Sequence, residues 1–207
     1  MCGFPVADEN TRLSEANIIR TDADNLGNVN VIYGGDFNWN SSDERGANVD
    51  SAWDLIVDDG IGQGFDAFDT TNVSGAGDWR DNENFKALHT QDPGGSMDDR
   101  FDVQFVSNEL FDGTGLELLQ GSYRVFGNNG THDLNGLITT GTGASFDVLM
   151  VLANFSDHLP VMSDFEFHAV PEPSSFVLLL GTLGVACARR LRRRHAPESK
   201  PDQLALF

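Results

Sequence analysis

Hydrophobic residues in the first part of the chain recur at spacings that separate helices from strands. Apolar side chains three and four positions apart predict an amphipathic helix that ends at Gly27; these side chains are Leu13, Ala16, Ile19, Ala23 and Leu26. An apolar run at 29–33 predicts a strand that leads into Gly34-Gly35-Asp36-Phe37-Asn38. The segment 52–57 predicts a second, short helix that is closed at Gly60.

The second half of the chain alternates between strand-like runs and long connections. Residues 69–98 are rich in Gly, Asp, Asn and Ser and predict a loop, as do residues 127–143. Apolar alternation or apolar runs predict four strands, at 101–106, 122–126, 147–153 and 161–168. Strands with interspersed helices predict an α/β layered domain, which about 169 residues are enough to stabilise with a buried core.

The tail of the chain has a different pattern. Pro171-Glu172-Pro173 precedes an apolar run from 176 to 188, and five arginines follow within 189–194. Cations are costly to carry across a bilayer, so this end is expected to stay on the cytoplasmic side. The run has 13 residues, or about 20 Å of helix against a bilayer core of roughly 30 Å. It is short for a permanent anchor, although a simple single-span tail anchor is the alternative.

In order and composition this tail resembles the PEP-CTERM sorting signal of bacterial surface proteins. The resemblance implies that Pro171-Glu172-Pro173 is read by a membrane-embedded exosortase, and that the hydrophobic and arginine parts are processed away. It divides the chain into a domain at 1–169, a sorting and transmembrane segment at 170–195 and a polar tail at 196–207. We expect an exported protein at the cell surface or outside the cell, tail-anchored through residues 176–188 before processing.

The charge balance supports this division. The chain carries 13 Lys and Arg against 32 Asp and Glu, and the part from residue 189 onward holds six of the cations and two of the anions. Residues 1–188 are therefore left with 7 cations and 30 anions. A surface this acidic repels polyanions and offers no basic stripe for a nucleic acid. Cys2 and Cys187 provide no disulfide framework.

Polar clusters lie at the ends of three predicted strands, where loops usually present functional side chains. They are Asp36 with Asn38, then Asp102, and then Asp157 with His158. Together they supply carboxylates suited to a metal, an amide donor, and a histidine with a carboxylate to orient it. Such a set suits metal-assisted phosphoester hydrolysis, in which the metal offsets phosphate charge and the histidine handles a proton.

Three motifs carry a resemblance to the endonuclease/exonuclease/phosphatase superfamily, which has the DNase I-like fold. In family order they are Gly35-Asp36-Phe37-Asn38, Arg100-Phe101-Asp102 and Ser156-Asp157-His158. The resemblance covers residues 10–168 and implies the C-terminal part of a four-layer α/β sandwich. Any one motif alone is weak, because Gly-Asp-Phe-Asn also suits an ordinary turn.

The resemblance implies a role for each of these residues. Asp36 positions or activates the attacking water, and Asn38 holds the scissile phosphate. Asp157 contacts a divalent metal, Mg²⁺ or else Mn²⁺ or Ca²⁺. His158 hydrogen-bonds the phosphate or acts as base, and Asp102 fixes its tautomer. The implied substrate is a phosphoester in a small molecule, a lipid headgroup or a nucleic acid, and we expect a monomer.

The sequence also departs from the superfamily's pattern. The resemblance places the principal metal ligand, a Glu, on a strand before Gly35, whereas Glu9 and Glu15 lie in or beside the first predicted helix. Residues 1–12 hold no secretory signal. We therefore expect an N-terminally truncated chain with little or no activity. The alternatives are a non-catalytic surface module derived from the same fold, and a fragment that does not fold.

Other conspicuous residues favour structural roles. The tryptophans Trp39, Trp53 and Trp79 are expected to pack in the core or under loops. His132 is expected in a surface loop, with a phosphate contact as the alternative. The Asp-rich stretches at 66–69 and 98–99 lack the ligand spacing of a calcium loop.

Overall fold

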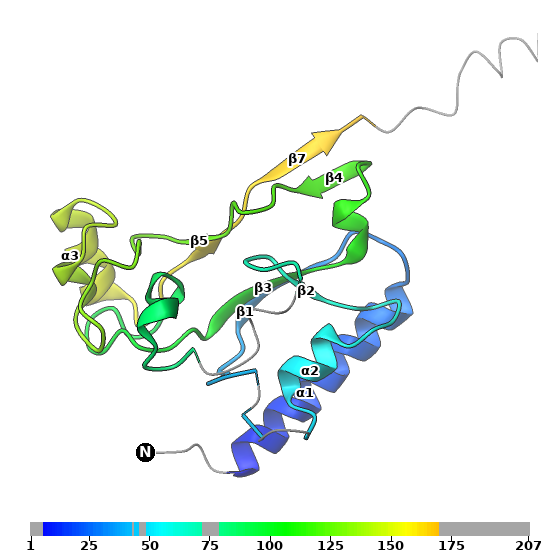
Figure 1. Cartoon of the computed structure of the whole chain (residues 1–207), viewed down its shortest axis with the longest axis horizontal. Coiled ribbons are helices and arrows are strands. Elements are labelled where there is room, and N and C mark those ends of the chain that lie inside the picture. The colour runs from blue at the N-terminus through cyan, green and yellow to red at the C-terminus, as the bar shows by residue number, and fades with distance from the viewer. Residues whose placement is uncertain (1–5, 43, 46–48, 72–78, 170–207) are drawn as a thin grey trace, which may run out of the picture. The chain divides into compact units, whose positions relative to one another are not determined.

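The computed structural model describes residues 6–42, 44–45, 49–71 and 79–169. The chain divides into a first unit at 1–168 and a second unit at 169–207, and the elements described below belong to the first. Helices and strands are mixed along the first unit, which confirms an α/β organisation (Figure 1). The Pro-Glu-Pro element, the apolar run at 176–188 and both cysteines lie outside the described residues.

The two helices predicted in the first part of the chain are both present. Helix α1 (Val6–Leu26) ends before Gly27, whose φ of 73° is the left-handed conformation that commonly terminates helices. Helix α2 (Ala52–Val57) begins at a capping box, in which Ser51 and Asp54 satisfy each other's backbone N–H groups. Both predictions are confirmed, with α1 beginning earlier than its apolar spacing indicated.

Arg20 joins these two helices, which lie side by side (Figure 1). Its guanidinium donates to the carbonyl oxygens of Leu55, Asp58 and Asp59 at 3.1, 2.6 and 3.1 Å. These carbonyls lie at the C-terminal end of α2, where backbone acceptors lack partners within a helix. Arg20 therefore caps α2 and fixes it against α1.

A three-stranded antiparallel sheet links the helices to the later part of the chain. Its order is β1–β3–β2, with β1 at Ile32–Asp36, β3 at Asp102–Val106 and β2 at Phe65–Asp66. The register pairs Asp36 directly with Asp102. Because paired residues project to the same face of a sheet, these two carboxylates are neighbours.

Two hydrophobic clusters pack around this sheet. The first lies between the sheet and the two helices, and its buried members are Ala16, Trp39, Ala52, Trp53, Ile56, Trp79, Val103 and Phe105. The second joins Val106 to later elements, and its other buried members are Ala67, Leu88, Met97, Leu110, Leu118, Tyr123, Val125, Ile138, Leu149 and Leu159. All three tryptophans are at most 3 % exposed, so their expected place in the core is confirmed.

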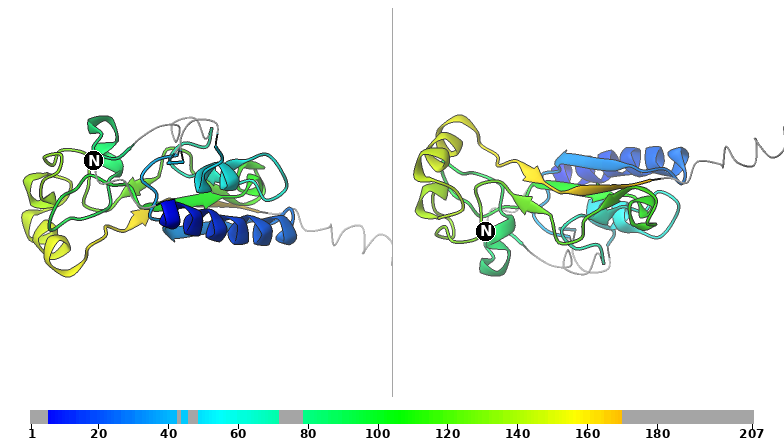
Figure 2. Two further views of the ribbon diagram at one scale, coloured as in Figure 1. Left: turned by 90° about the horizontal axis from the view of Figure 1, so that it is seen from below. Right: turned by 90° about the horizontal axis from the view of Figure 1, so that it is seen from above.

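The later elements are short strands, single turns and one helix. Strand β4 (Gly115–Leu118) pairs with β7 (Phe165–His168), and β5 (Arg124–Val125) pairs with β6 (Val161–Met162). The 3₁₀ turns are η1 (Glu83–Leu88), η2 (Asn108–Phe111) and η3 (Ile138–Thr140), and the helix is α3 (Phe146–Phe155). In the views of Figure 2, α3 and α1 lie toward opposite ends of the first unit.

The structure corrects several element boundaries. Strand β1 begins at Ile32, three residues after the predicted start, and the predicted strand at 161–168 is two strands with different partners. The strands β2 and β4 were not predicted. The segments predicted as loops at 69–98 and 127–143 contain η1 and η3 in their described parts.

The prediction of a strand at 147–153 is wrong, because these residues lie in helix α3. A continuous apolar run fits a buried strand and a helix segment equally well. Its Leu, Met and Ala residues favour a helix, and Ser145 occupies the N-cap position. As a result the Ser156-Asp157-His158 motif follows a helix, not a strand.

Candidate active site

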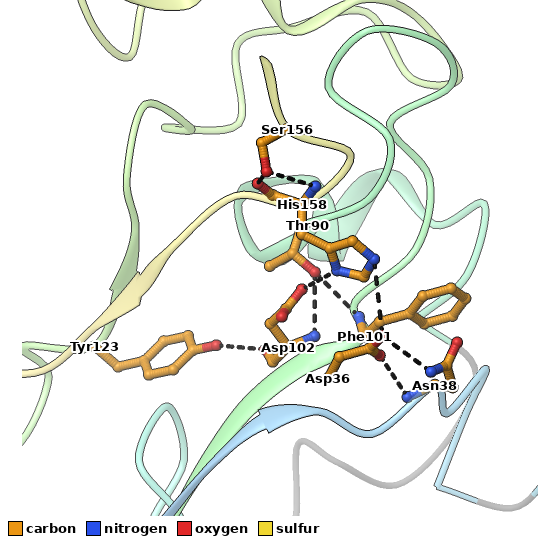
Figure 3. Close-up of polar contacts among 8 residues, drawn as sticks. All are labelled: Asp36, Asn38, Thr90, Phe101, Asp102, Tyr123, Ser156 and His158. Atoms are coloured by element: carbon orange, nitrogen blue, oxygen red, sulfur yellow. Dashed lines mark hydrogen bonds and ion pairs between the residues drawn. The ribbon is translucent and has the colours of Figure 1, made fainter. Parts of the chain in front are cut away.

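Three separate segments bring the predicted site residues to one end of the sheet (Figure 3). Asp36 is the last residue of β1 and Asp102 is the first residue of β3, so antiparallel pairing places them together. His158 comes from the loop between α3 and β6. The structure thus brings Asp36, Asn38, Asp102 and His158 into one cluster.

The shortest contact in this cluster is a histidine–carboxylate pair, which we call the dyad. The Nδ1–H group of His158 donates to Oδ2 of Asp102 at 2.7 Å. A carboxylate has no proton to give, so the proton of neutral His158 lies on Nδ1 and its lone pair lies on Nε2. Nε2 faces Oδ2 of Asp36 at 3.8 Å. The dyad is partly open to solvent, because the His158 side chain is 22 % exposed.

Asp36 also holds Asn38 in place. Its Oδ1 accepts the backbone N–H of Asn38 and its Oδ2 accepts the side-chain Nδ2–H, both at 2.9 Å. Asn38 adopts a φ of 53°, a left-handed conformation that asparagine tolerates better than most residues. This turn leaves one N–H of the Asn38 amide for a ligand, because the amide group has two.

The surroundings of the dyad raise the pKa of His158 above its ordinary value. Burial alone would lower this pKa, but the hydrogen bond and charge of Asp102 act in the opposite direction. The charges of Asp36 and Asp157 add to that effect. His158 is therefore a stronger base than a free histidine, which suits a group that accepts a proton near neutral pH.

The loop that carries His158 is closed by its own serine. The Oγ of Ser156 donates to the carbonyl oxygen of His158 at 2.6 Å and accepts the His158 N–H at 3.2 Å. Asp157 is exposed in this loop. Its negative charge contributes to the raised pKa of His158.

Thr90 and Tyr123 support Asp102, although no sequence motif marks either residue. Oγ1 of Thr90 accepts the N–H groups of Phe101 at 3.1 Å and of Asp102 at 3.2 Å. The hydroxyl of Tyr123 donates to the carbonyl oxygen of Asp102 at 3.0 Å (Figure 3). Thr90 lies in a segment predicted as loop and Tyr123 in a predicted strand, so only their hydrogen bonds identify them.

The described residues do not fit a complete magnesium site. In the ranges that the structure describes, no group of three or more His, Cys, Asp or Glu side chains is arranged so that it could hold a metal ion. Both oxygens of Asp36 accept hydrogen bonds from Asn38, and Asp102 is engaged with His158. Glu15 of α1 lines a cavity of about 280 Å³ beside Asp36, without completing a ligand set.

A second pair of histidines, His89 and His132, is sealed inside the domain; we call them the buried pair. The expectation that His132 lies in a surface loop is wrong, since it is 1 % exposed and His89 is fully buried. His132 Nδ1 donates to Oδ1 of Asn128 at 3.1 Å, and His89 Nε2 donates to the Trp79 carbonyl at 2.8 Å. Their ring centroids are 6.3 Å apart.

Burial governs the titration of this pair. It lowers the pKa of His132 to about 4, and the charges of His89 and Lys86 act in the same direction. It also lowers the pKa of His89, against the opposing effect of the Trp79 carbonyl. Both rings are therefore neutral at pH 7, and neither is open to a substrate.

The Asp-rich stretch at 66–69 has a structural explanation. Both oxygens of Asp66 accept hydrogen bonds from the Arg100 guanidinium at 2.8 Å, and both side chains are at most 2 % exposed. The guanidinium also lies 5.5 Å from the ring centroid of Tyr123. Arg100, the first residue of the Arg-Phe-Asp motif, thus anchors the start of β3 through its ion pair with Asp66.

The tail of the chain matches a known family of sorting signals. Residues 169–194 match the family model of the PEP-CTERM protein-sorting motif. This chain carries a PEP-CTERM motif. No curated protein and no solved structure gives a significant match to the chain.

The PEP-CTERM motif indicates where in the cell the protein is sent. It marks the chain for export and for sorting at the cell surface, with processing by an exosortase and association with the membrane. Within the described ranges, which stop at 169, no helix combines the length and apolarity needed to cross a bilayer. The motif itself begins one residue after the end of β7.

Proposed function

We propose that this protein is a phosphoester hydrolase of the endonuclease/exonuclease/phosphatase type that acts at or beyond the cell surface. The observation that carries the proposal is the dyad, whose free Nε2 faces Asp36 while Asp36 holds Asn38. Three motifs from distant parts of the sequence thus meet in one partly exposed cluster. The PEP-CTERM motif supports export and sorting at the cell surface, so we propose that the substrates are met outside the cytoplasm.

The residues suit the steps of phosphoester hydrolysis. Nε2 of His158 is the atom that would take a proton or hydrogen-bond a phosphate oxygen, and Asp102 keeps the ring in that tautomer. Asp36 would orient the attacking water, and the spare N–H of Asn38 would bind a phosphate oxygen. Asp157 retains the role of a metal contact that the resemblance implies.

The metal is a separate part of the proposal. A divalent cation, Mg²⁺ or else Mn²⁺ or Ca²⁺, would offset phosphate charge when bound. The described residues supply too few donors to hold it alone. The same shortage of donors is the observation that favours the second candidate, a non-catalytic binding module on the same scaffold.

Charge guides the choice of substrate. With 32 Asp and Glu against 13 Lys and Arg, the chain repels long polyanions. A small phosphoester or a single lipid headgroup presents less negative charge than a nucleic acid backbone. We therefore place small phosphodiesters and phosphomonoesters ahead of DNA and RNA.

The test is hydrolysis of an aryl phosphodiester by the full chain with Mg²⁺, Mn²⁺ or Ca²⁺. His158→Ala should lower the rate by roughly 10²- to 10⁴-fold, the range for loss of a general acid or base. His168→Ala is the matched control, because His168 also pairs with a carboxylate, Glu117, at 2.8 Å but lies on β7. An unchanged rate in His158→Ala would refute the site. No hydrolysis with any of the three metals would favour the binding module.

A further inference from the structure

Thr90 is a buried residue between the two segments that carry the dyad. It has no exposed surface, and it precedes the start of β3 by 12 residues. Its backbone N–H donates to the Asp99 carbonyl at 2.8 Å, which ties it to the segment that leads into β3 at Asp102. The following residue, Gln91, forms isolated bridges with Asp99 and with His158. The segment at 90–91 therefore lies between both halves of the dyad.

The oxygen atoms of Thr90 divide between these halves. Oγ1 accepts the N–H groups of Phe101 and Asp102 at 3.1 and 3.2 Å. The backbone carbonyl oxygen accepts the N–H of Leu159, the residue after His158, at 2.8 Å. One residue thus bonds the backbone beside each partner of the dyad, although these partners are 56 residues apart; Figure 3 shows the bonds of Thr90 to Phe101 and Asp102.

We propose that Thr90 is a positioning residue that fixes the distance between His158 and Asp102. This inference rests on the proposed function, since it concerns the same dyad. The hydrogen bond of the dyad is 2.7 Å long, and His158 lies in a loop that Ser156 closes through its side chain. A misplacement of about 1 Å in a catalytic group is enough to cost on the order of 10² in rate.

The chemistry of Thr90 allows its two contributions to be separated. Thr90→Val keeps the shape of the side chain but removes Oγ1, so the N–H groups of Phe101 and Asp102 lose their acceptor. Thr90→Ser keeps the oxygen and removes only a methyl group. The backbone carbonyl that holds Leu159 is present in both variants.

The experiment uses the full chain and two readouts. The first is the downfield proton NMR resonance of the His158 Nδ1–H group, assigned by its loss in His158→Ala. The second is aryl phosphodiester hydrolysis, measured with whichever of Mg²⁺, Mn²⁺ and Ca²⁺ supports the wild-type reaction and analysed as separate kcat and KM values. Thr90→Val should lose or shift the resonance and lower kcat by about tenfold or more with KM nearly unchanged. Thr90→Ser should restore both.

Ser107→Ala is the matched control for general destabilisation. Ser107 Oγ accepts the Val31 N–H at 3.0 Å and donates to the Val29 carbonyl at 2.9 Å, so it also joins two segments through one hydroxyl. It follows β3 at the end opposite Asp102. Its loss should lower the unfolding temperature and leave the His158 resonance in place.

Each outcome bears on the proposal. A folded Thr90→Val protein with an unchanged resonance and kcat would overturn it, as would a wild-type protein without the resonance. If Thr90→Val does not fold, hydrogen exchange in the wild type decides: slow exchange of the Asp102 and Leu159 amides supports the proposal, and fast exchange contradicts it. A resonance that depends on Thr90 in a protein without hydrolysis would sustain the positioning role and reject the proposed function.

Discussion

The dyad and the buried pair place the same side chain in opposite surroundings. His158 is 22 % exposed and donates to a carboxylate, whereas His132 is 1 % exposed and donates to a neutral amide oxygen. The pKa of His158 is raised, and the pKa of His132 is lowered to about 4. A charged acceptor favours the imidazolium form, while burial without one excludes it.

The two surroundings distinguish a partly exposed histidine from two buried ones. His158 can take and release a proton near neutral pH, and its Nε2 is within reach of solvent and of Asp36. Burial keeps His132 and His89 neutral, and the amide oxygen of Asn128 and the carbonyl oxygen of Trp79 orient their rings. We therefore expect changes at the dyad to alter rate more than stability, and changes at the buried pair to do the reverse.

The largest expected effect is that of Asp102→Asn on rate. Asn cannot supply the negative charge that orients His158, so we expect hydrolysis to fall by about 10²-fold or more. The free energy of unfolding should change little, because Asp102 is partly exposed. Steady-state hydrolysis and urea unfolding on the same sample give both values. A large loss of stability with an unchanged rate would reverse the comparison.

The next effect is acid destabilisation through the buried pair. The folded-state pKa of His132 is about 4, below its ordinary value of 6.5. Between these two pH values His132 is therefore protonated in the unfolded chain and neutral in the folded chain. Stability should fall as the pH drops from 6.5 to 4, by at most about 3 kcal/mol. Urea unfolding at a series of pH values measures this slope, and His132→Gln should flatten it.

His158 should act on stability with the opposite sign. Its folded-state pKa is raised, so its contribution is complete below pH 6.5 and is lost as the pH rises through that raised pKa. Comparing the pH profiles of His158→Ala and His132→Gln separates the two contributions. Parallel profiles would show that the two environments do not differ as the structure indicates.

Asn128→Ala should have a smaller effect, confined to stability. Asn128 Nδ2 donates to the carbonyls of Lys86 and His89 at 2.9 and 2.8 Å, and its Oδ1 accepts from Gly130 and His132. Removing it leaves buried groups without partners, which costs about 1–3 kcal/mol. Thermal unfolding measures the loss. The rate per folded molecule should match the wild type, and a specific loss of rate would contradict the separation.

The smallest expected effect is that of Ser156→Ala. Ser156 closes the loop that carries His158 through two short-range bonds in an exposed position. We expect a stability change below about 1 kcal/mol and a rate loss of only a few-fold. A loss as large as that of Asp102→Asn would show that the loop, and not Thr90, holds the dyad together.

The sequence predicted those elements whose signals are local. The spacing from Leu13 to Leu26 and the glycine that follows define α1, and alternation defines β3. Helix α3 was mispredicted because its continuous apolar run has no period that separates helix from strand. The pairing of β6 and β7 with different partners depends on long-range contacts, which a local pattern does not contain.

The sequence predicted which four of the candidate residues come together, but not which residues support them. Asp36, Asn38, Asp102 and His158 were selected from motif order, and the structure places them together. Thr90 has no motif, because its role lies in two hydrogen bonds to backbone groups elsewhere in the chain. The burial of His132 likewise depends on which segments pack over it.

The break between β6 and β7 has a mechanical consequence. The PEP-CTERM motif starts at 169, so tension applied through the tail first reaches the pair of His168 with Gly115. We expect the β4–β7 ladder to open one pair at a time from that end. Since β6 has its own partner in β5, separation of β7 from β4 would leave the segment next to the dyad paired. A force on the tail would then separate these two strands before it deformed the candidate site.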